Sequence, residues 1–387
     1  MAITILSSPN QFMAAYNQVA YTVSSNNTAQ PNFNFIIDVN QTSGISNPLA
    51  RLKYPKQPNS STLTFDIGSV LKNYVSYDFK AAMEDVCTAN DNSQLKYFLQ
   101  FRELYDVSGI PTLSGVLASN PTTPSTTSYQ MAGNAIFDFE DFTPTSYAGV
   151  EVATHGFLNT SLPEKIEPNQ NKILTFLRNA TMFDTVRITS GGVNYDEPIY
   201  TPITNKHLFN INAGDLLLLI QGVVVVNNTY TVSLVNLGTV ICSKVFTYET
   251  PCSQYPTVRL HWLNKLGGFD SFNFEKNTVN ATEIERKQFK APLPIGYSTS
   301  DRLKTNYNTT VNDVITINSD WISAEQSLLF EELSNSPVIY LERSSDDFVA
   351  VNILNSSYEI KTFLTDRKMF NVTFEIEYSY SRYRQSL

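Results

Sequence analysis

The chain has 387 residues, of which 42% are hydrophobic and only 16% charged, and its formal net charge is -9. The hydrophobic fraction excludes a globally disordered chain. The acidic balance argues against a sequence-independent nucleic-acid-binding protein, which needs a basic face to displace counterions from phosphates. At roughly 100 to 200 residues per domain, the length favours two domains.

The low charged fraction means that Asn, Ser and Thr must supply much of the polar surface. These residues hydrogen-bond their own backbone in turns, which suits a β-rich protein. Neutral polar groups also lose less free energy than charges when they are buried against another subunit. Three cysteines, Cys87, Cys242 and Cys252, are too few and odd in number for a disulfide framework, so we expect buried free thiols.

The first half of the chain reads as strands separated by loops. Apolar residues alternate with polar ones over Phe33–Val39, Leu63–Ile67 and Leu95–Phe101. Residues 68–77 have helical spacing and predict a short helix. Residues 117–128 contain two prolines and a Ser/Thr run, and predict a surface loop.

Gly191 and Gly192 weaken any regular element near Ser190–Glu197, so the domain boundary is expected there. The two predicted domains are therefore residues 1–190 and residues 191–387.

Three β-rich runs open the second domain: Leu216–Val226, Thr229–Leu237 and Thr239–Tyr248. The first lies in the most apolar stretch of the chain, which is too short to span a bilayer. The opening residues also lack the pattern of a secretory signal. No membrane insertion is expected.

A β-hairpin is predicted over residues 258–275, with the turn at Gly267 and Gly268. Large apolar side chains alternate with polar ones on both sides, and glycine tolerates the positive φ that a tight turn requires.

One clear helix is predicted over residues 324–334. Ser323 stands at the N-cap and Gln326 three positions later, the spacing of a capping box, and Pro337 lies beyond the helix end. The chain then finishes with strict alternation from Phe370 to Tyr380, which predicts a strand whose edge is open to a neighbour. The fold expected for the whole chain is mainly β: two β-sandwich-like domains with one or two short helices.

The sequence contains few candidate catalytic or metal-binding residues. His155, His207 and His261 are far apart, and none has a second ligand at metal-binding spacing. The adjacent carboxylates Glu140–Asp141, Glu331–Glu332 and Asp346–Asp347 point away from one another on a strand or a helix. We expect no catalytic residue, no metal, no cofactor and no enzymatic activity.

Aromatic residues are the more informative group, with 21 Tyr and 24 Phe. Aromatics with alternating polar neighbours fill strand cores and subunit interfaces. Tyr residues also surround two arginines at the C-terminus, where an edge strand ending in solvated arginines is expected rather than nucleic-acid contact. The candidate interface residues are Trp262, Phe269, Phe374, Tyr378, Tyr380, Arg382 and Arg384.

Three segments of the second half, in order, resemble one module. They are the hairpin around Trp262, Asn318–Glu325 leading into the helix and on to Tyr340, and Val349–Thr362 with the closing strand. Across roughly residues 190–387 they are similar to a C-terminal pattern of tail, ring, hub and baseplate-like proteins of crAss-like bacteriophages that infect Bacteroidetes.

The resemblance implies a structural virion protein of the phage tail, made in the cytoplasm of the host bacterium. Its partners would be copies of itself in a ring, a hexamer or a dodecamer, and other tail or portal-connector proteins. Two alternatives stay open: a receptor-recognition or carbohydrate-binding module, with Trp262, Trp321 or exposed tyrosines as the sugar platform, and a depolymerase.

Overall fold

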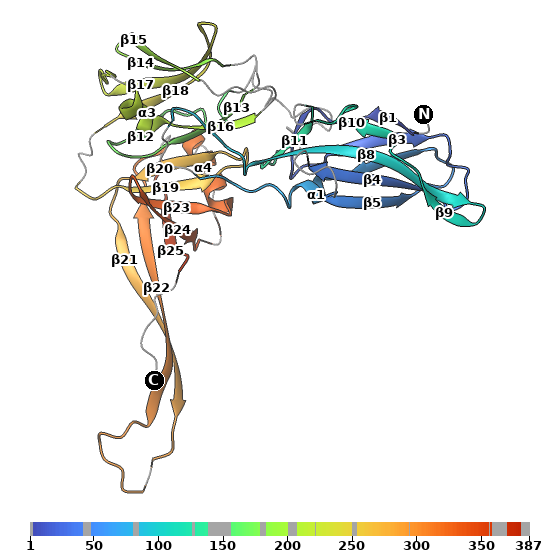
Figure 1. The fold of residues 1–387 in the computed structure, drawn as a ribbon. Coiled ribbons are helices and arrows are strands. Elements are labelled where there is room, and N and C mark those ends of the chain that lie inside the picture. The colour runs from blue at the N-terminus through green and yellow to red at the C-terminus, as the bar shows by residue number, and fades with distance from the viewer. Residues whose placement is uncertain are drawn as a thin grey trace. The chain divides into compact units, whose positions relative to one another are not determined.

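The computed structural model describes residues 3–41, 48–79, 85–125, 128–137, 156–178, 183–199, 207–220, 222–249, 254–293, 295–355, 357 and 370–380. Strands dominate this part of the chain, which confirms the mainly β fold (Figure 1). No helix within these ranges has the length and apolar composition needed to cross a bilayer.

The described chain divides into two compact units. The first comprises Met1–Pro163, Asn171–Thr247 and Asn264–Phe269, and the second comprises Glu164–Gln170, Tyr248–Leu263 and Asp270–Leu387. Six alternating segments mean that the chain passes five times from one unit to the other.

The first unit begins with a β-sandwich. Tyr21 and Phe65 of the smaller sheet meet the larger sheet, where Tyr21 Oη lies 3.4 Å from Tyr97 Oη and the Phe65 ring lies 6.2 Å from the Phe101 ring. The smaller sheet has the order β1-β3-β6: β1 (Ile3–Ser7), β3 (Ala20–Ser25) and β6 (Thr62–Asp66). The larger sheet has the order β2-β11-β8-β4-β5, with β9 and β10 also paired to β8: β2 (Phe12–Ala14), β11 (Gln130–Gly133), β8 (Gln94–Val107), β4 (Asn34–Gln41), β5 (Ala50–Pro55), β9 (Ile110–Leu113) and β10 (Ala118–Asn120).

Two more sheets follow. The first has the order β13-β16-β7: β13 (Ile173–Arg178), β16 (His207–Asn212) and β7 (Thr88–Ala89). The second has the order β12-β18-β17-β14-β15: β12 (Glu164–Ile166), β18 (Thr239–Tyr248), β17 (Thr229–Asn236), β14 (Thr185–Ser190) and β15 (Val193–Pro198).

The predicted domain boundary near Ser190 does not coincide with the division into units. β14 and β15 pair along their whole length, and Gly191 and Gly192 form their turn with φ of 57° and 77°. The two glycines are therefore a hairpin turn inside the first unit rather than a linker.

The strand predicted at Leu216–Val226 is wrong. Residues Ala213–Leu219 form helix α3, and the Asn212 side chain caps it by accepting from Gly214 N at 3.2 Å. Leucine has a high helix propensity, and the N-cap at Asn212, one helical turn before the leucine run, favours a helix. The short helix expected after residue 67 is present only as the single turn α1 (Gly68–Leu71).

The second unit contains one antiparallel sheet with the order β20-β19-β23-β24-β25-β22-β21. The predicted hairpin is present as β19 and β20. The strands are β20 (Phe269–Phe274), β19 (Val258–Leu263), β23 (Ile339–Ser344), β24 (Asp347–Ile353), β25 (Thr373–Tyr378), β22 (Lys304–Asn318) and β21 (Val279–Lys290). The closing strand β25 lies between β24 and β22, so it is an inner strand and not the open edge that its sequence predicted.

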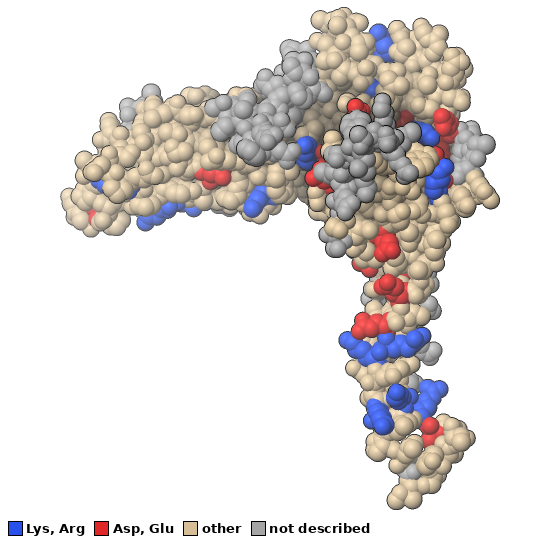
Figure 2. Space-filling model, turned by 180° about the vertical axis from the view of Figure 1, so that it is seen from behind, with Lys and Arg blue, Asp and Glu red and all other residues tan. Residues whose placement is uncertain are grey.

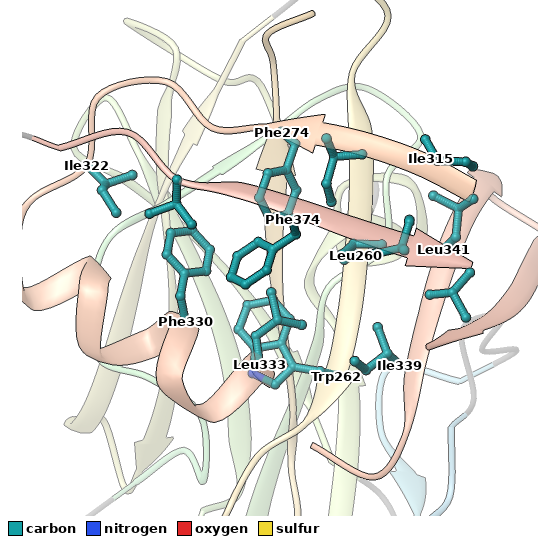
Figure 3. Close-up of a cluster of buried hydrophobic side chains, with 14 residues drawn as sticks. Leu260, Trp262, Phe274, Ile315, Ile322, Phe330, Leu333, Ile339, Leu341 and Phe374 are labelled. Atoms are coloured by element: carbon teal, nitrogen blue, oxygen red, sulfur yellow. The ribbon is translucent and has the colours of Figure 1, made fainter. Parts of the chain in front are cut away.

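Helix α4 (Ala324–Asn335) covers the apolar face of this sheet and confirms the predicted helix. Its capping box is formed as expected: Gln326 N donates to Ser323 Oγ at 3.2 Å, and Ser323 N donates to Gln326 Oε1 at 3.0 Å. Phe330 and Leu333 point from the helix toward Trp262 and Phe374 (Figure 3). The rings of Phe272, Phe274 and Phe374 lie 4.8, 5.8 and 5.7 Å from the Phe330 ring.

We expect Phe330→Ala to lower the free energy of unfolding of the second unit by about 3–5 kcal/mol, because it leaves a cavity at the centre of this core. Both tryptophans of the chain, Trp262 and Trp321, belong to the second unit, so urea denaturation followed by tryptophan fluorescence reports on it.

Leu328→Ala on the same helix is the matched control. Its side chain is 54% exposed, and the expected change is about 0.5 kcal/mol or less. Equal effects of the two substitutions would contradict the assigned core.

Candidate functional site

The residues with catalytic or metal-binding potential are scattered. No group of three His, Cys, Asp or Glu side chains that could hold a metal ion occurs among the described residues. His155, Glu140 and Asp141 lie outside them. Glu331 is exposed on α4, and Asp347 lies 3.9 Å from Arg343.

The described cysteines are free thiols. Burial raises the pKa of Cys87 to about 12 and that of Cys242 to about 11, so both are protonated at neutral pH. A thiol is a poor nucleophile compared with the thiolate. Cys252 lies outside the described residues.

His207 lies in a polar contact within the first unit. Its Nε2 is 2.7 Å from Gln94 Nε2 and 3.0 Å from Asp91 Oδ1, and its Nδ1 is 2.9 Å from Lys96 Nζ. Burial, and then the positive charge of Lys96, lower the pKa of His207, while burial lowers the pKa of Lys96. The ring is therefore neutral at physiological pH, and it packs on Phe209 at 5.1 Å.

A buried ionic cluster lies on the face of the second-unit sheet opposite α4. Arg259 is 1% exposed, and its Nη2 lies 3.1 Å from Glu164 Oε1 while its Nε lies 3.3 Å from Glu342 Oε2. Its Nη atoms also donate to Asn273 Oδ1 at 2.6 Å and to Ser271 Oγ at 2.9 Å.

His261 completes this cluster. Its Nε2 lies 2.7 Å from Glu342 Oε2 and its side chain is fully buried. Two carboxylates then face one guanidinium and one imidazole, so the cluster is electrically balanced when the imidazole carries a proton. The two glutamates and the two basic side chains expose between 0 and 7% of their surface, too little for a substrate to reach them. We assign the cluster a structural role.

The glycine turn of the β19–β20 hairpin belongs to the first unit, where its geometry is tightly fixed. Asn264 Oδ1 accepts from Leu266 N and Gly268 N at 3.0 and 2.9 Å, and its Nδ2 donates to Leu158 O at 2.9 Å. Gly267 has φ of 84°, and a Cβ at Gly268 would come within 2.6 Å of Leu158 O. The motif that is most recognisable in the sequence is therefore explained by backbone packing.

Three candidate interface residues are core residues instead. Trp262, Phe269 and Phe374 expose 0, 2 and 1% of their surface, so no partner can contact them in the folded chain. They alternate with polar residues because they face the interior of the protein from a strand. Tyr380 is 53% exposed and stacks on the partly buried Tyr378 at 5.4 Å, whereas Arg382 and Arg384 lie outside the described residues.

The most exposed element of the second unit is a two-stranded arm, which we define as residues 282–313. β22 pairs with β25 only over Val314–Asn318, whereas its pairing with β21 continues to Lys304. The two strands therefore leave the sheet together (Figure 1). All twelve residues of β21 are exposed, and a strand of that length extends about 40 Å.

Charge is separated along the arm. Most acidic side chains lie near the sheet and the basic side chains lie toward the tip, where one acidic side chain also lies, as Figure 2 shows. The acidic group near the sheet is Glu283, Glu285 and Asp313, and the basic group is Arg286, Lys287, Lys290, Arg302 and Lys304, with the acidic Asp301 among them.

No protein-family model matches this chain, and no curated protein matches it either. The functional interpretation therefore depends on the geometry and on the sequence resemblance described above.

Sequence reasoning missed both the arm and the ionic cluster. β21 has polar or charged residues on both of its faces, so it lacks the alternation that marks a half-buried strand. The cluster did leave a signal in the sequence. Arg259 and His261 alternate with Leu260 and Trp262, which places the two basic side chains together on one face of β19.

We expect Arg259→Met to lower the free energy of unfolding of the second unit by about 3–5 kcal/mol, because it leaves Glu164 buried without its cation and Glu342 with His261 alone. Arg343→Met is the control: its side chain is 42% exposed and the expected loss is below about 1 kcal/mol. Urea denaturation followed by tryptophan fluorescence measures both. A loss below about 1 kcal/mol for the Arg259 variant would contradict the role assigned to the cluster.

Proposed function

We propose that this protein is a structural component of a bacteriophage tail that assembles as a homo-oligomeric ring and joins neighbouring tail or connector proteins. The observation that carries the proposal is the exposed arm. A two-stranded ribbon is marginally stable alone in water. An arm with twelve exposed residues in one strand therefore gains most from contact with another subunit.

Apolar side chains on the arm and at its tip support this role. Ile284 and Phe289 are 46 and 50% exposed, and Leu293, Ile295 and Tyr297 at the tip are 42, 108 and 60% exposed. Large exposed apolar groups close together mark interaction sites. The resemblance of residues 190–387 to crAss-like phage tail and ring proteins supplies the virion context, and ring closure would use heterologous contacts between copies.

The ring proposal predicts that the purified protein forms closed rings. The mass in solution and negative-stain electron microscopy test this together: the mass gives the copy number, with six or twelve expected, and the images give the symmetry. A protein that stays monomeric at every concentration would contradict self-assembly into a ring.

A carbohydrate-binding tail module is the second candidate, and one observation favours it. Trp321 is 60% exposed beside Asp320, whose carboxylate lies 3.0 Å from Lys276 Nζ. An exposed indole next to polar groups is suited to stack on a sugar ring. Trp262 cannot take this role because it is fully buried.

If the protein binds host glycans through Trp321, added cell-surface glycan will change the tryptophan fluorescence of the wild type but not that of Trp321→Phe. The remaining Trp262 is shielded from the ligand, so it serves as an internal control. An unchanged wild-type signal over a full titration counts against the carbohydrate-binding alternative and leaves the structural proposal in place.

A further inference from the structure

Among the described residues, no strand pairs with the outer edge of β21. β21 is the last strand of the seven-stranded sheet, and each of its residues is exposed. Its outward-facing N–H and C=O groups therefore have no strand to pair with among the described residues. An open edge of this kind is a template for strand addition by another chain.

The charged side chains of β21 are not matched inside the arm. Within the described residues, the five charged groups between Glu283 and Lys290 form no ion pair. Their neighbours across the ladder are neutral up to the bulge: Glu283 lies opposite Asn312, Glu285 opposite Thr310, Arg286 opposite Thr309 and Lys287 opposite Asn308. Beyond the bulge, Lys290 lies directly opposite Lys304, and like charges in that position are destabilising.

The order of these charges selects a partner and an orientation. Along β21, Glu283 and Glu285 come first, and Arg286, Lys287 and Lys290 follow. A strand with acidic residues in its first half and basic residues in its second half is complementary to itself when two copies run antiparallel. Two copies that run parallel would instead place like charges side by side.

We propose that the arm pairs with the arm of a second copy of this chain, with the outer edges of the two β21 strands antiparallel about a two-fold axis. With the axis through Arg286, each Glu285 lies opposite Lys287 of the second copy on one face of the ladder, and the two Arg286 side chains meet on the other face. This contact goes beyond the proposed ring, because a two-fold contact joins copies in pairs whereas ring closure uses heterologous contacts.

Charges on an edge strand commonly prevent unwanted pairing. In β21 the two signs are separated along the strand, so the same charges oppose parallel pairing and favour the antiparallel pair. Opposite charges across a ladder contribute roughly 0.2–1 kcal/mol per pair, and two-fold symmetry doubles each contribution.

Charge exchange tests this pairing. The first variant, Glu283→Lys with Glu285→Lys, makes the central part of β21 wholly basic, and the second, Arg286→Glu with Lys287→Glu, makes it acidic up to Lys287. Each variant alone is expected to weaken association by about tenfold or more. An equimolar mixture of the two is expected to regain association as a mixed pair, because the basic arm then faces the acidic one.

Sedimentation velocity measures the association of each variant and of the mixture over a concentration series. The control is Lys53→Glu with Lys72→Glu at two exposed lysines of the first unit, which changes the net charge by the same amount as the second variant and leaves association unchanged. All four substituted arm positions are exposed, so the variants fold like the wild type, and circular dichroism checks this.

The possible results distinguish the arm-pairing proposal from the ring proposal. Pairs that are lost in each variant and regained in the mixture support arm pairing, whether or not rings form. Rings that are unaffected by either variant overturn arm pairing and leave the ring proposal intact. A wild type that stays monomeric overturns both. Loss in both variants without recovery in the mixture overturns self-pairing and indicates that the arm binds another surface.

Discussion

The buried guanidinium of Arg259 is the interaction on which the second unit depends. It holds together β12, β19, β20 and β23 through Glu164, Ser271, Asn273 and Glu342, and Glu164 is 178 residues away from Glu342 in the sequence. Taking these charges out of water is costly, so the cluster is stable only with every member in place. The opposite face of the same sheet is covered by α4 and its phenylalanine cluster. Strands β19, β20 and β23 are therefore buried on both faces, whereas β24 and β25, nearer the arm, keep one face partly exposed.

The sequence predicted the elements whose local chemistry agrees with their tertiary environment. The capping box at Ser323 and the glycine turn after Asn264 each specify one backbone geometry, and both are present in the structure. Prediction from sequence was less successful where one residue pattern is compatible with two different structures. Gly191 and Gly192 serve a hairpin turn as well as they would serve a linker, and a leucine run fits a helix as well as a buried strand until the cap at Asn212 is considered.

The arm shows a different limit of sequence reasoning. Alternation reveals a strand only when one of its faces is buried within the same chain, and β21 is exposed on both faces. The burial that would produce an alternating pattern is expected to come from another molecule, so a single sequence contains no alternation to read. Interface residues predicted from alternation are therefore core residues in the structure, as the buried side chains of Trp262 and Phe374 show.

Among the described residues, the arm has an unpaired strand edge and charged side chains without an oppositely charged neighbour. These two features are the basis of the proposed pairing with a second copy. A cryo-electron microscopy reconstruction of the assembled protein, at a resolution that separates strands, tests it most directly. We expect density in which β21 of one copy lies beside an antiparallel β21 of another, at the strand spacing of about 4.8 Å. A reconstruction in which the outer edge of β21 faces solvent in every copy would contradict it.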